Sequence, residues 1–154
     1  MLLAIDTSTE FIGLAIYDGA QVLAELSWRS LNYHTVELVP AIETMLSRAG
    51  IKRTELTGLG VAIGPGSFTG LRIGLSVAKG IALALNLPAV GIPSLDVLAA
   101  SQPPLRRPML ALLKVGRGRF AYHRYICKKN VWLPQGAMRV DDARTIAATI
   151  TSPV

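Results

Sequence analysis

The chain has 154 residues, of which 51% are hydrophobic and 17% charged, with a formal net charge of +6. A chain of this length buries about two-thirds of its unfolded surface, so we expect a well-cored globular protein. No apolar run is expected to reach the roughly 18 residues of a membrane span, and no basic segment precedes the first apolar run. The single cysteine, Cys127, excludes an internal disulfide. These features predict a soluble cytoplasmic protein.

Apolar periodicity predicts strands that alternate with helices over the first hundred residues. Asp18-Gly19 is a strong hairpin signal between the second and third strands. Gly50 ends the first helix, and Pro93-Ser94 is expected to cap the third. The predicted strands cover residues 2–5, 11–17, 21–28, 59–63 and 89–92, and the predicted helices cover residues 35–49, 69–85 and 95–100.

Three prolines within residues 102–108 indicate a linker. We therefore expect an N-terminal lobe over residues 1–102, a linker over 103–108 and part of a second lobe over 109–154. The second part is predicted to hold strands at 109–113 and 120–126, and a helix capped by Asp141 or Asp142 that runs to Ile150.

Residues 64–74 read GPGSFTGLRIG and join the fourth predicted strand to a helix. Glycines and a proline favour a tight turn, and the hydroxyls of Ser67 and Thr69 can cap the helix. Such a turn presents backbone N–H groups that suit an anion, but it lacks the lysine of a P-loop. Tight packing and phosphate binding both remain open from these residues alone.

Together with LAIDTST at residues 3–9, this motif closely resembles the TsaB (YeaZ) family, the non-catalytic relatives of the TsaD/Kae1 glycoprotease-like proteins. The resemblance covers residues 1 to about 130. It implies an α/β fold with an actin-like, ribonuclease H-like (ASKHA) lobe, a mixed central sheet and an incomplete second lobe. It also implies a supporting role in making N6-threonylcarbamoyladenosine (t6A) on tRNA.

A weak nucleotide or phosphate site is expected where the actin-like fold places its first phosphate loop. Its candidate residues are Asp6, Thr7, Ser8, Gly64, Gly66, Ser67 and Thr69. The alternative is that Asp6 and the hydroxyls only satisfy the backbone of a turn. Lys114 occupies the place of a second acidic loop and cannot bind magnesium. This departure argues against ATP hydrolysis by the chain alone. No cofactor is expected in this chain itself, and ATP or ADP is expected only at a partner interface.

No metal site or catalytic residue is expected. In the catalytic TsaD relatives, two histidines four residues apart on the first helix bind a metal, whereas here the pair is His34 and Leu38. One imidazole cannot hold a transition metal, so His34 is expected to cap the helix or to lie exposed. The chain is therefore expected to be an accessory subunit of a threonylcarbamoyltransferase rather than an enzyme by itself.

The helix after the glycine turn carries small residues every four positions and is apolar nearly all round, which favours a subunit interface. The alternative is packing on the chain's own sheet. The family resemblance implies pairing through the first two helices. The predicted interface residues are Val39, Ile42, Leu46, Gly70, Leu71, Gly74, Ala78 and Ile81.

Charge is concentrated in the last third of the sequence. Residues 106–154 hold 10 Lys and Arg and 2 Asp and Glu, and residues 106–129 hold no acid at all. Such a run suits RNA phosphates, but it also suits a solvated surface or an acidic protein partner. Without interleaved stacking aromatics, the solvated or protein-facing interpretation is favoured.

The leading hypothesis is a non-catalytic scaffold that pairs with a TsaD-like enzyme in t6A modification. The expected partners are that enzyme, a TsaE-like ATPase and a second copy of the chain, with indirect contact to tRNA and none to a membrane. The alternatives are a stand-alone actin-like ATP-binding protein or ATPase, and an RNA-contacting module built on residues 106–129.

Overall fold

The computed structural model describes residues 1–30 and 33–150. These residues form two compact units. The first unit comprises Met1–Ile63 and Ser67–Ile92, and the second comprises Gly64–Gly66 and the chain from Pro93 onward.

The first unit is built on a five-stranded mixed sheet of order β3-β2-β1-β4-β5. Its first three strands form an antiparallel meander, because β2 pairs with β1 and then with β3. β4 runs parallel to β1, and β5 runs parallel to β4. The strands are β1 (Leu2–Asp6), β2 (Phe11–Tyr17), β3 (Val22–Arg29), β4 (Gly58–Ala62) and β5 (Ala89–Ile92).

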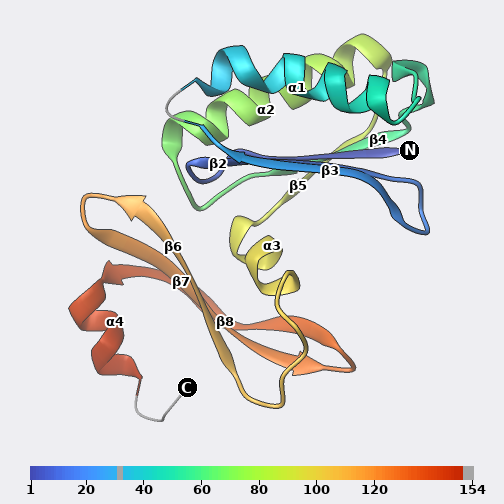
Figure 1. Cartoon of the computed structure of the whole chain (residues 1–154). Helices are drawn as coiled ribbons and strands as arrows, with labels where there is room; N and C mark the ends of the chain where they lie inside the picture. Colours follow the sequence, from blue (N-terminus) through green and yellow to red (C-terminus); the bar gives the residue numbers. More distant parts are fainter. Residues whose placement is uncertain (31–32, 151–154) are drawn as a thin grey trace. The chain divides into compact units, whose positions relative to one another are not determined.

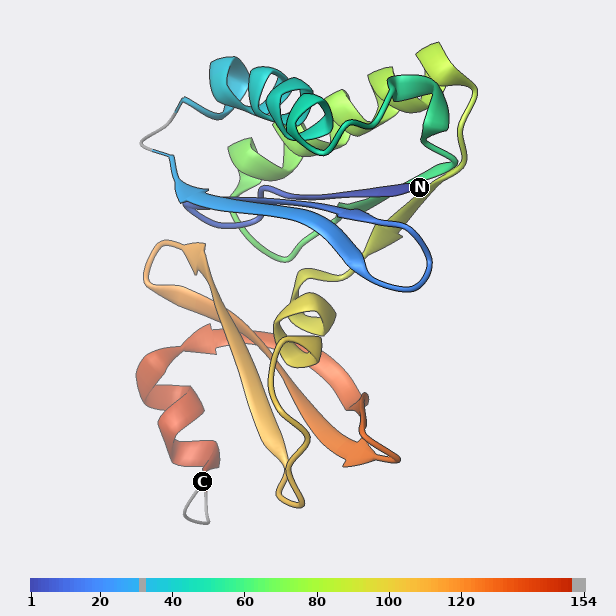
Figure 2. The same cartoon turned by 45° about the vertical axis from the view of Figure 1, so that its right-hand side comes forward.

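Two helices, α1 (His34–Arg48) and α2 (Phe68–Leu85), cover one face of this sheet (Figures 1 and 2). Alternate strand residues face them, as expected for a period of two, and together they form the core of the unit. Its fully buried strand members include Leu3, Ile5, Ile12, Leu14 and Ile16, and its helix members include Leu38, Ile42, Met45, Leu46 and Ala78.

Both ends of α2 are fixed by residues suited to those positions. Ser67 is the N-cap and its Oγ accepts the Gly70 amide N–H at 3.2 Å, as its sequence position predicts. Asn86 ends the helix with φ 53°, a left-handed conformation that asparagine tolerates better than most residues. These two caps therefore define where α2 begins and ends.

The second unit is a three-stranded antiparallel sheet of order β6-β7-β8 with one short helix on each side (Figures 1 and 2). α3 packs Leu95 and Ala99 on Ala111, Ala121 and Tyr125 of the sheet. The elements are α3 (Ser94–Ala100), β6 (Met109–Gly116), β7 (Arg119–Lys128), β8 (Val131–Asp142) and α4 (Ala143–Thr149).

The division between the units lies at Pro93, ten residues before the linker that the prolines indicate. The reason is the apolar contact of α3 with the second sheet, which sequence periodicity does not reveal. Of the expected Pro93-Ser94 cap of α3, only Pro93 takes the N-cap position, and the Ser94 hydroxyl accepts the Gly64 amide N–H at 3.1 Å instead.

Strand β8 is absent from the sequence prediction. Pro134 and Gly136 interrupt its alternation, and both residues disfavour a strand interior. β8 is the edge of its sheet, where a proline leaves no ladder hydrogen bond unmade. Asp142 caps α4 through Oδ1, which accepts the Thr145 amide N–H at 2.8 Å, in agreement with one of the two predicted caps.

Candidate functional site

The loop after β1 uses its polar groups to brace the first unit. Asp6 accepts the Ser8 amide N–H through Oδ1 at 2.8 Å, which is an Asx turn. Thr7 donates its hydroxyl hydrogen to the Gly70 carbonyl oxygen at 2.8 Å. The Ser67 amide N–H donates to the Ser8 carbonyl oxygen at 2.6 Å. The loop therefore ties the end of β1 to the start of α2.

The glycine turn joins the two units. Gly64 and Gly66 belong to the second unit, whereas Ser67 and Thr69 belong to the first. Gly64 has φ 99°, a region that favours glycine, and its carbonyl oxygen accepts the Ser94 amide N–H at 2.8 Å. Gly66 is half-buried and Thr69 is exposed. The turn thus makes backbone contacts on both sides of the boundary between the units.

A nucleotide phosphate does not fit the loop of Asp6, Thr7 and Ser8 in this arrangement. Thr7 and Ser8 are 1% and 2% exposed, so their hydroxyls cannot reach a bound group. The Thr7 hydroxyl and one Asp6 oxygen are already used inside the protein. The geometry therefore favours the packing interpretation of these residues over the phosphate-binding one.

Helix α2 combines an apolar sequence with little burial. Of its eighteen residues, Gly70, Gly74 and Ala78 are buried, whereas Phe68 and Leu83 are 75% and 86% exposed. An apolar surface of this kind on a helix usually marks a contact with another molecule. The uncovered side of α2 is therefore the strongest candidate for a functional surface in the first unit.

By length and composition alone, α2 is long and apolar enough to cross a membrane. The expectation that no segment reaches this length is therefore wrong, because such a span tolerates Arg72 and Lys79. Helices of globular cores meet the same criterion, and the buried stripe of α2 packs in the first unit.

Five of the eight predicted interface residues are buried inside the first unit: Ile42, Leu46, Gly70, Gly74 and Ala78. A Cβ atom added to Gly70 would overlap the Thr7 carbonyl oxygen, and one added to Gly74 would overlap Thr7 Oγ1. The small residues therefore let α2 approach the loop after β1, which was the alternative interpretation of the stripe. Sequence spacing reveals the stripe but not the partner it faces.

The remaining predicted interface residues lie nearer the surface. Val39 is 45% exposed, and Leu71 and Ile81 are half-buried. Val36, Phe68 and Leu83 are exposed as well, and sequence analysis missed them. For Phe68 and Leu83, the signal is that large apolar residues lie off the small-residue stripe of α2.

A groove of about 430 Å³ runs between the two helices. It is lined by Thr35, Thr69, Arg72, Ile73, Ser76 and Val77. Val39 follows Thr35 by one helical turn and so lies on the same side of α1. We call this groove, together with the exposed residues Val36, Val39, Phe68 and Leu83, the helix-pair surface.

A polar cluster anchors the start of α1 to the end of β3. The Trp28 indole N–H donates to Glu37 Oε2 at 3.1 Å. Hydrogen bonds from the Ser30 hydroxyl and from Trp28 lower the pKa of the Glu37 carboxyl. These bonds fix the start of α1 on strand β3.

His34 lies at the start of α1 but neither caps it nor lies exposed, so that expectation is wrong. Tyr33 is the N-cap residue, and His34 is 8% exposed with Nε2 3.4 Å from the Thr9 carbonyl oxygen. Leu38, four residues later, is fully buried in the apolar core. Within residues 1–30 and 33–150, no three His, Cys, Asp or Glu residues gather in a group that could hold a metal ion.

The sequence is similar to a known family and to curated proteins. Residues 29–133 match the sequence model of the family "TsaD: tRNA N6-adenosine threonylcarbamoyltransferase". The chain is 39% identical over 100 residues to "tRNA threonylcarbamoyladenosine biosynthesis protein TsaB" of Escherichia coli, which covers 64% of this chain and 42% of that protein. The chain thus spans less than half the length of this curated relative.

Solved structures of similar fold include "YeaZ from Pseudomonas aeruginosa", with a TM-score of 0.82 and 26% identity over 90% of this chain and 66% of that one. The ethanolamine utilization protein EutJ from Carboxydothermus hydrogenoformans shares the fold alone, with a TM-score of 0.50 and 17% identity over 91% of this chain and 51% of that one. The predicted actin-like lobe with a mixed sheet and a partial second lobe is thereby confirmed. The chain belongs to the TsaD family, and within it to the TsaB (YeaZ) group.

Proposed function

We propose that this chain is a non-catalytic subunit that pairs with a TsaD-type enzyme in the t6A modification of tRNA. The observation that carries the proposal is the apolar helix α2, which packs one side on the core of its own unit and leaves Phe68 and Leu83 largely exposed. Exposed apolar side chains cost free energy in water, about 25 cal/mol per Å² of apolar surface, and a partner helix relieves that cost. The names of the similar proteins place them in threonylcarbamoyladenosine biosynthesis.

In this proposal the helix-pair surface is the contact with the enzyme. Val39 and Leu83 supply exposed apolar side chains at separate points of that surface, and the groove between the helices receives side chains of the partner. The same surface would pair two copies of the chain when the enzyme is absent. A TsaE-like ATPase would join the assembled pair rather than the isolated chain.

Leu38 is consistent with a non-catalytic role for the chain. The family resemblance places a second metal-binding histidine of the catalytic relatives at this position, and here a leucine fills the apolar core. The stand-alone ATPase alternative is weakened by Thr7 and Ser8, which are buried and bonded internally. It is also weakened by Lys114, an exposed residue of β6 where the resemblance would place an acid.

The test is a calorimetric titration of a purified TsaD-type protein with the chain and with single variants. Val39→Asp and Leu83→Asp each place a charge in the proposed contact and should weaken binding at least tenfold, as loss of a buried contact of about 1.4 kcal/mol does. Val90→Asp is the matched control, because Val90 is 60% exposed on β5, away from both helices.

Equal affinity for all three variants, or no binding by the unaltered chain, would contradict the proposal. Magnesium-dependent ATP turnover by the purified chain would instead support the alternative of a stand-alone ATPase.

A further inference from the structure

The edge strand of the second unit bows away from its neighbour. Tyr122 of β7 pairs with Arg139 of β8, but Arg124 pairs with Gln135, so two extra residues of β8 lie opposite this stretch of β7. Gly136 permits the bend with φ 74°. Such bulges bend the strand and occur often beside functional sites.

His123 of β7 holds the bulge in place. Its Nε2 lies 3.1 Å from the Gly136 carbonyl oxygen, and its ring packs edge-on against Tyr125 at 5.2 Å between centroids. The bulge is therefore a fixed feature of the sheet, with defined partners on the neighbouring strand.

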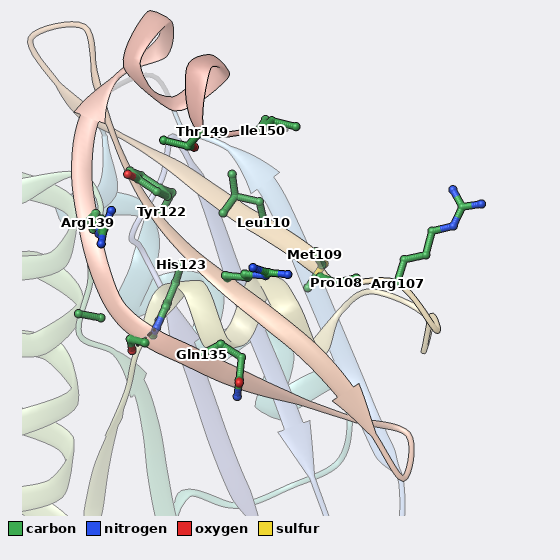
Figure 3. Close-up of a pocket in the computed structure, with 13 residues that line it drawn as sticks. Arg107, Pro108, Met109, Leu110, Tyr122, His123, Gln135, Arg139, Thr149 and Ile150 are labelled. Carbon is green, nitrogen blue, oxygen red and sulfur yellow. Dashed lines mark hydrogen bonds between the residues drawn. The ribbon is translucent and has the colours of Figure 1, made fainter. Parts of the chain in front are cut away.

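The bulge opens a cavity of about 480 Å³ between the strands and the end of α4. This volume lies in the range of small-molecule sites. Leu110 and Tyr122 provide its apolar surface, and Figure 3 shows these side chains between Thr149 and Ile150 at the end of α4 and Gln135 on β8. Tyr122 is 7% exposed and its hydroxyl donates to Asp141 Oδ2 at 2.8 Å, so its position is fixed.

Three arginines line this cavity: Arg107, Arg124 and Arg139. All three are exposed, and in Figure 3 the Arg107 side chain extends away from the other labelled residues. The two ion pairs found among residues 1–30 and 33–150 both lie in the first unit. The exposed guanidinium groups of Arg107 and Arg124 are therefore available for an anion from outside, whereas that of Arg139 also lies beside the Tyr122 hydroxyl.

Each carboxylate of the second unit accepts a hydrogen bond within that unit, and Asp141 does so from Tyr122, which lines the cavity. From Pro93 onward the sequence holds ten Lys and Arg residues but three Asp residues. Asp96 accepts the Tyr125 hydroxyl hydrogen at 2.6 Å, Asp141 accepts that of Tyr122, and Asp142 caps α4. The unit therefore has a surplus of positive charge around a fixed cavity.

We propose that this cavity binds phosphodiester groups of an RNA strand. An arginine guanidinium matches the geometry of a phosphate and can bind two of its oxygens, and the apolar surface of Leu110 can take the adjoining ribose or base. The cavity and its charge are features of the structure alone. The choice of RNA as the anionic ligand rests on the proposed function in tRNA modification. Direct contact with tRNA replaces the indirect contact that the sequence favoured.

The test measures binding of a fluorescently labelled tRNA transcript to the whole chain by anisotropy, between 50 and 200 mM KCl. If three arginines contact phosphates of a single-stranded segment, affinity should fall on the order of 20-fold over this range, because each contact contributes a slope of about 0.7. The double variant Arg124→Gln with Arg139→Gln should bind more weakly at 50 mM. The affinity of this double variant for tRNA should fall only about threefold between 50 and 200 mM KCl.

The matched control removes the same charge from the first unit, by Arg48→Gln together with Lys52→Gln, two exposed residues. The control should bind tRNA as the unaltered chain does. The proposal would be overturned if both double variants lost tRNA affinity equally, or if the Arg124→Gln, Arg139→Gln variant lost none. Absence of tRNA binding by the unaltered chain would also overturn it. Poly-L-glutamate that competes as well as unlabelled tRNA at equal charge would assign the cavity to an acidic protein and would overturn it too.

Because this assay uses the chain alone, its outcome is separate from pairing with the enzyme. RNA binding without pairing would contradict the proposed function only. Pairing without RNA binding would contradict the inference about the cavity only.

Discussion

Gly70→Ala tests how α2 is seated on the loop after β1. A Cβ atom at this position would lie far inside van der Waals contact with the Thr7 carbonyl oxygen, which is backbone and cannot rotate away. It would also lie 3.3 Å from Ser67 Oγ, the cap of the helix. The new methyl group must therefore displace either α2 or the loop.

The magnitude follows from two opposing effects. Alanine is favoured over glycine inside a helix by up to about 1 kcal/mol. Overpacking a closely packed contact costs about 1–3 kcal/mol, and moving the loop also weakens the 2.8 Å hydrogen bond from Thr7 to Gly70, a loss of about 1 kcal/mol. We expect a net destabilisation of about 1–4 kcal/mol, or a Tm lower by about 2–16 °C.

Gly80→Ala is the matched control in the same helix. Gly80 is exposed and an added Cβ meets nothing within 4 Å, so the variant should be more stable by up to about 1 kcal/mol. The assay is urea and thermal unfolding followed by circular dichroism. Equal stabilisation of both variants would refute the close contact between α2 and Thr7, and with it the orientation of the helix-pair surface.

Two further predictions concern single hydrogen bonds. Tyr125→Phe should destabilise the second unit by about 1.5–3 kcal/mol in urea unfolding, because it removes a 2.6 Å hydrogen bond to the Asp96 carboxylate. Glu37→Gln should lower stability at pH 7 and lose that effect at low pH. Hydrogen bonds from Ser30 and Trp28 lower the Glu37 pKa from 4.5, so its contribution is complete above about pH 4.5 and disappears as the pH falls below that value.

Controls for these two variants come from similar side chains at the surface of the first unit. Tyr17→Phe removes an exposed hydroxyl that donates to the Gly19 carbonyl oxygen and should change stability by less than about 0.5 kcal/mol. Glu25→Gln replaces an exposed carboxylate of β3. The difference in its free energy of unfolding between pH 7 and pH 3 should stay close to that of the unaltered chain. If the stability of Glu37→Gln changed with pH as much as that of the unaltered chain, the stabilising role of the Glu37 carboxylate would be contradicted.

Sequence periodicity predicted most of the elements, because strand and helix patterns depend on local spacing. The order of the eight elements predicted up to residue 100 and the Ser67 cap are confirmed, and the structure adds a short 3-10 helix at Arg53–Glu55. β8 was missed because a proline and a glycine that a paired central strand would not tolerate are acceptable in an edge strand with a bulge. Edge position is a property of the whole sheet and cannot be read from a short window.

The candidate site was predicted less well, since it depends on which groups meet in space. The stripe of Gly70 and Gly74 was recognised, but its neighbour Thr7 lies more than sixty residues earlier in the chain. For the same reason the hydroxyl of Thr7 looked available for phosphate although Gly70 occupies it. The exposed Phe68 and Leu83 became visible only after the buried face of α2 was known.

The most direct test of the central claim is the mass in solution of the chain, alone and mixed with a TsaD-type enzyme, measured by light scattering during size-exclusion chromatography. We predict a homodimer that exchanges into a one-to-one heterodimer, and Leu83→Asp should leave both proteins as separate species at the same concentrations. A monomer that passes the enzyme without a change in mass, or a heterodimer unaffected by Leu83→Asp, would contradict the role of the helix-pair surface.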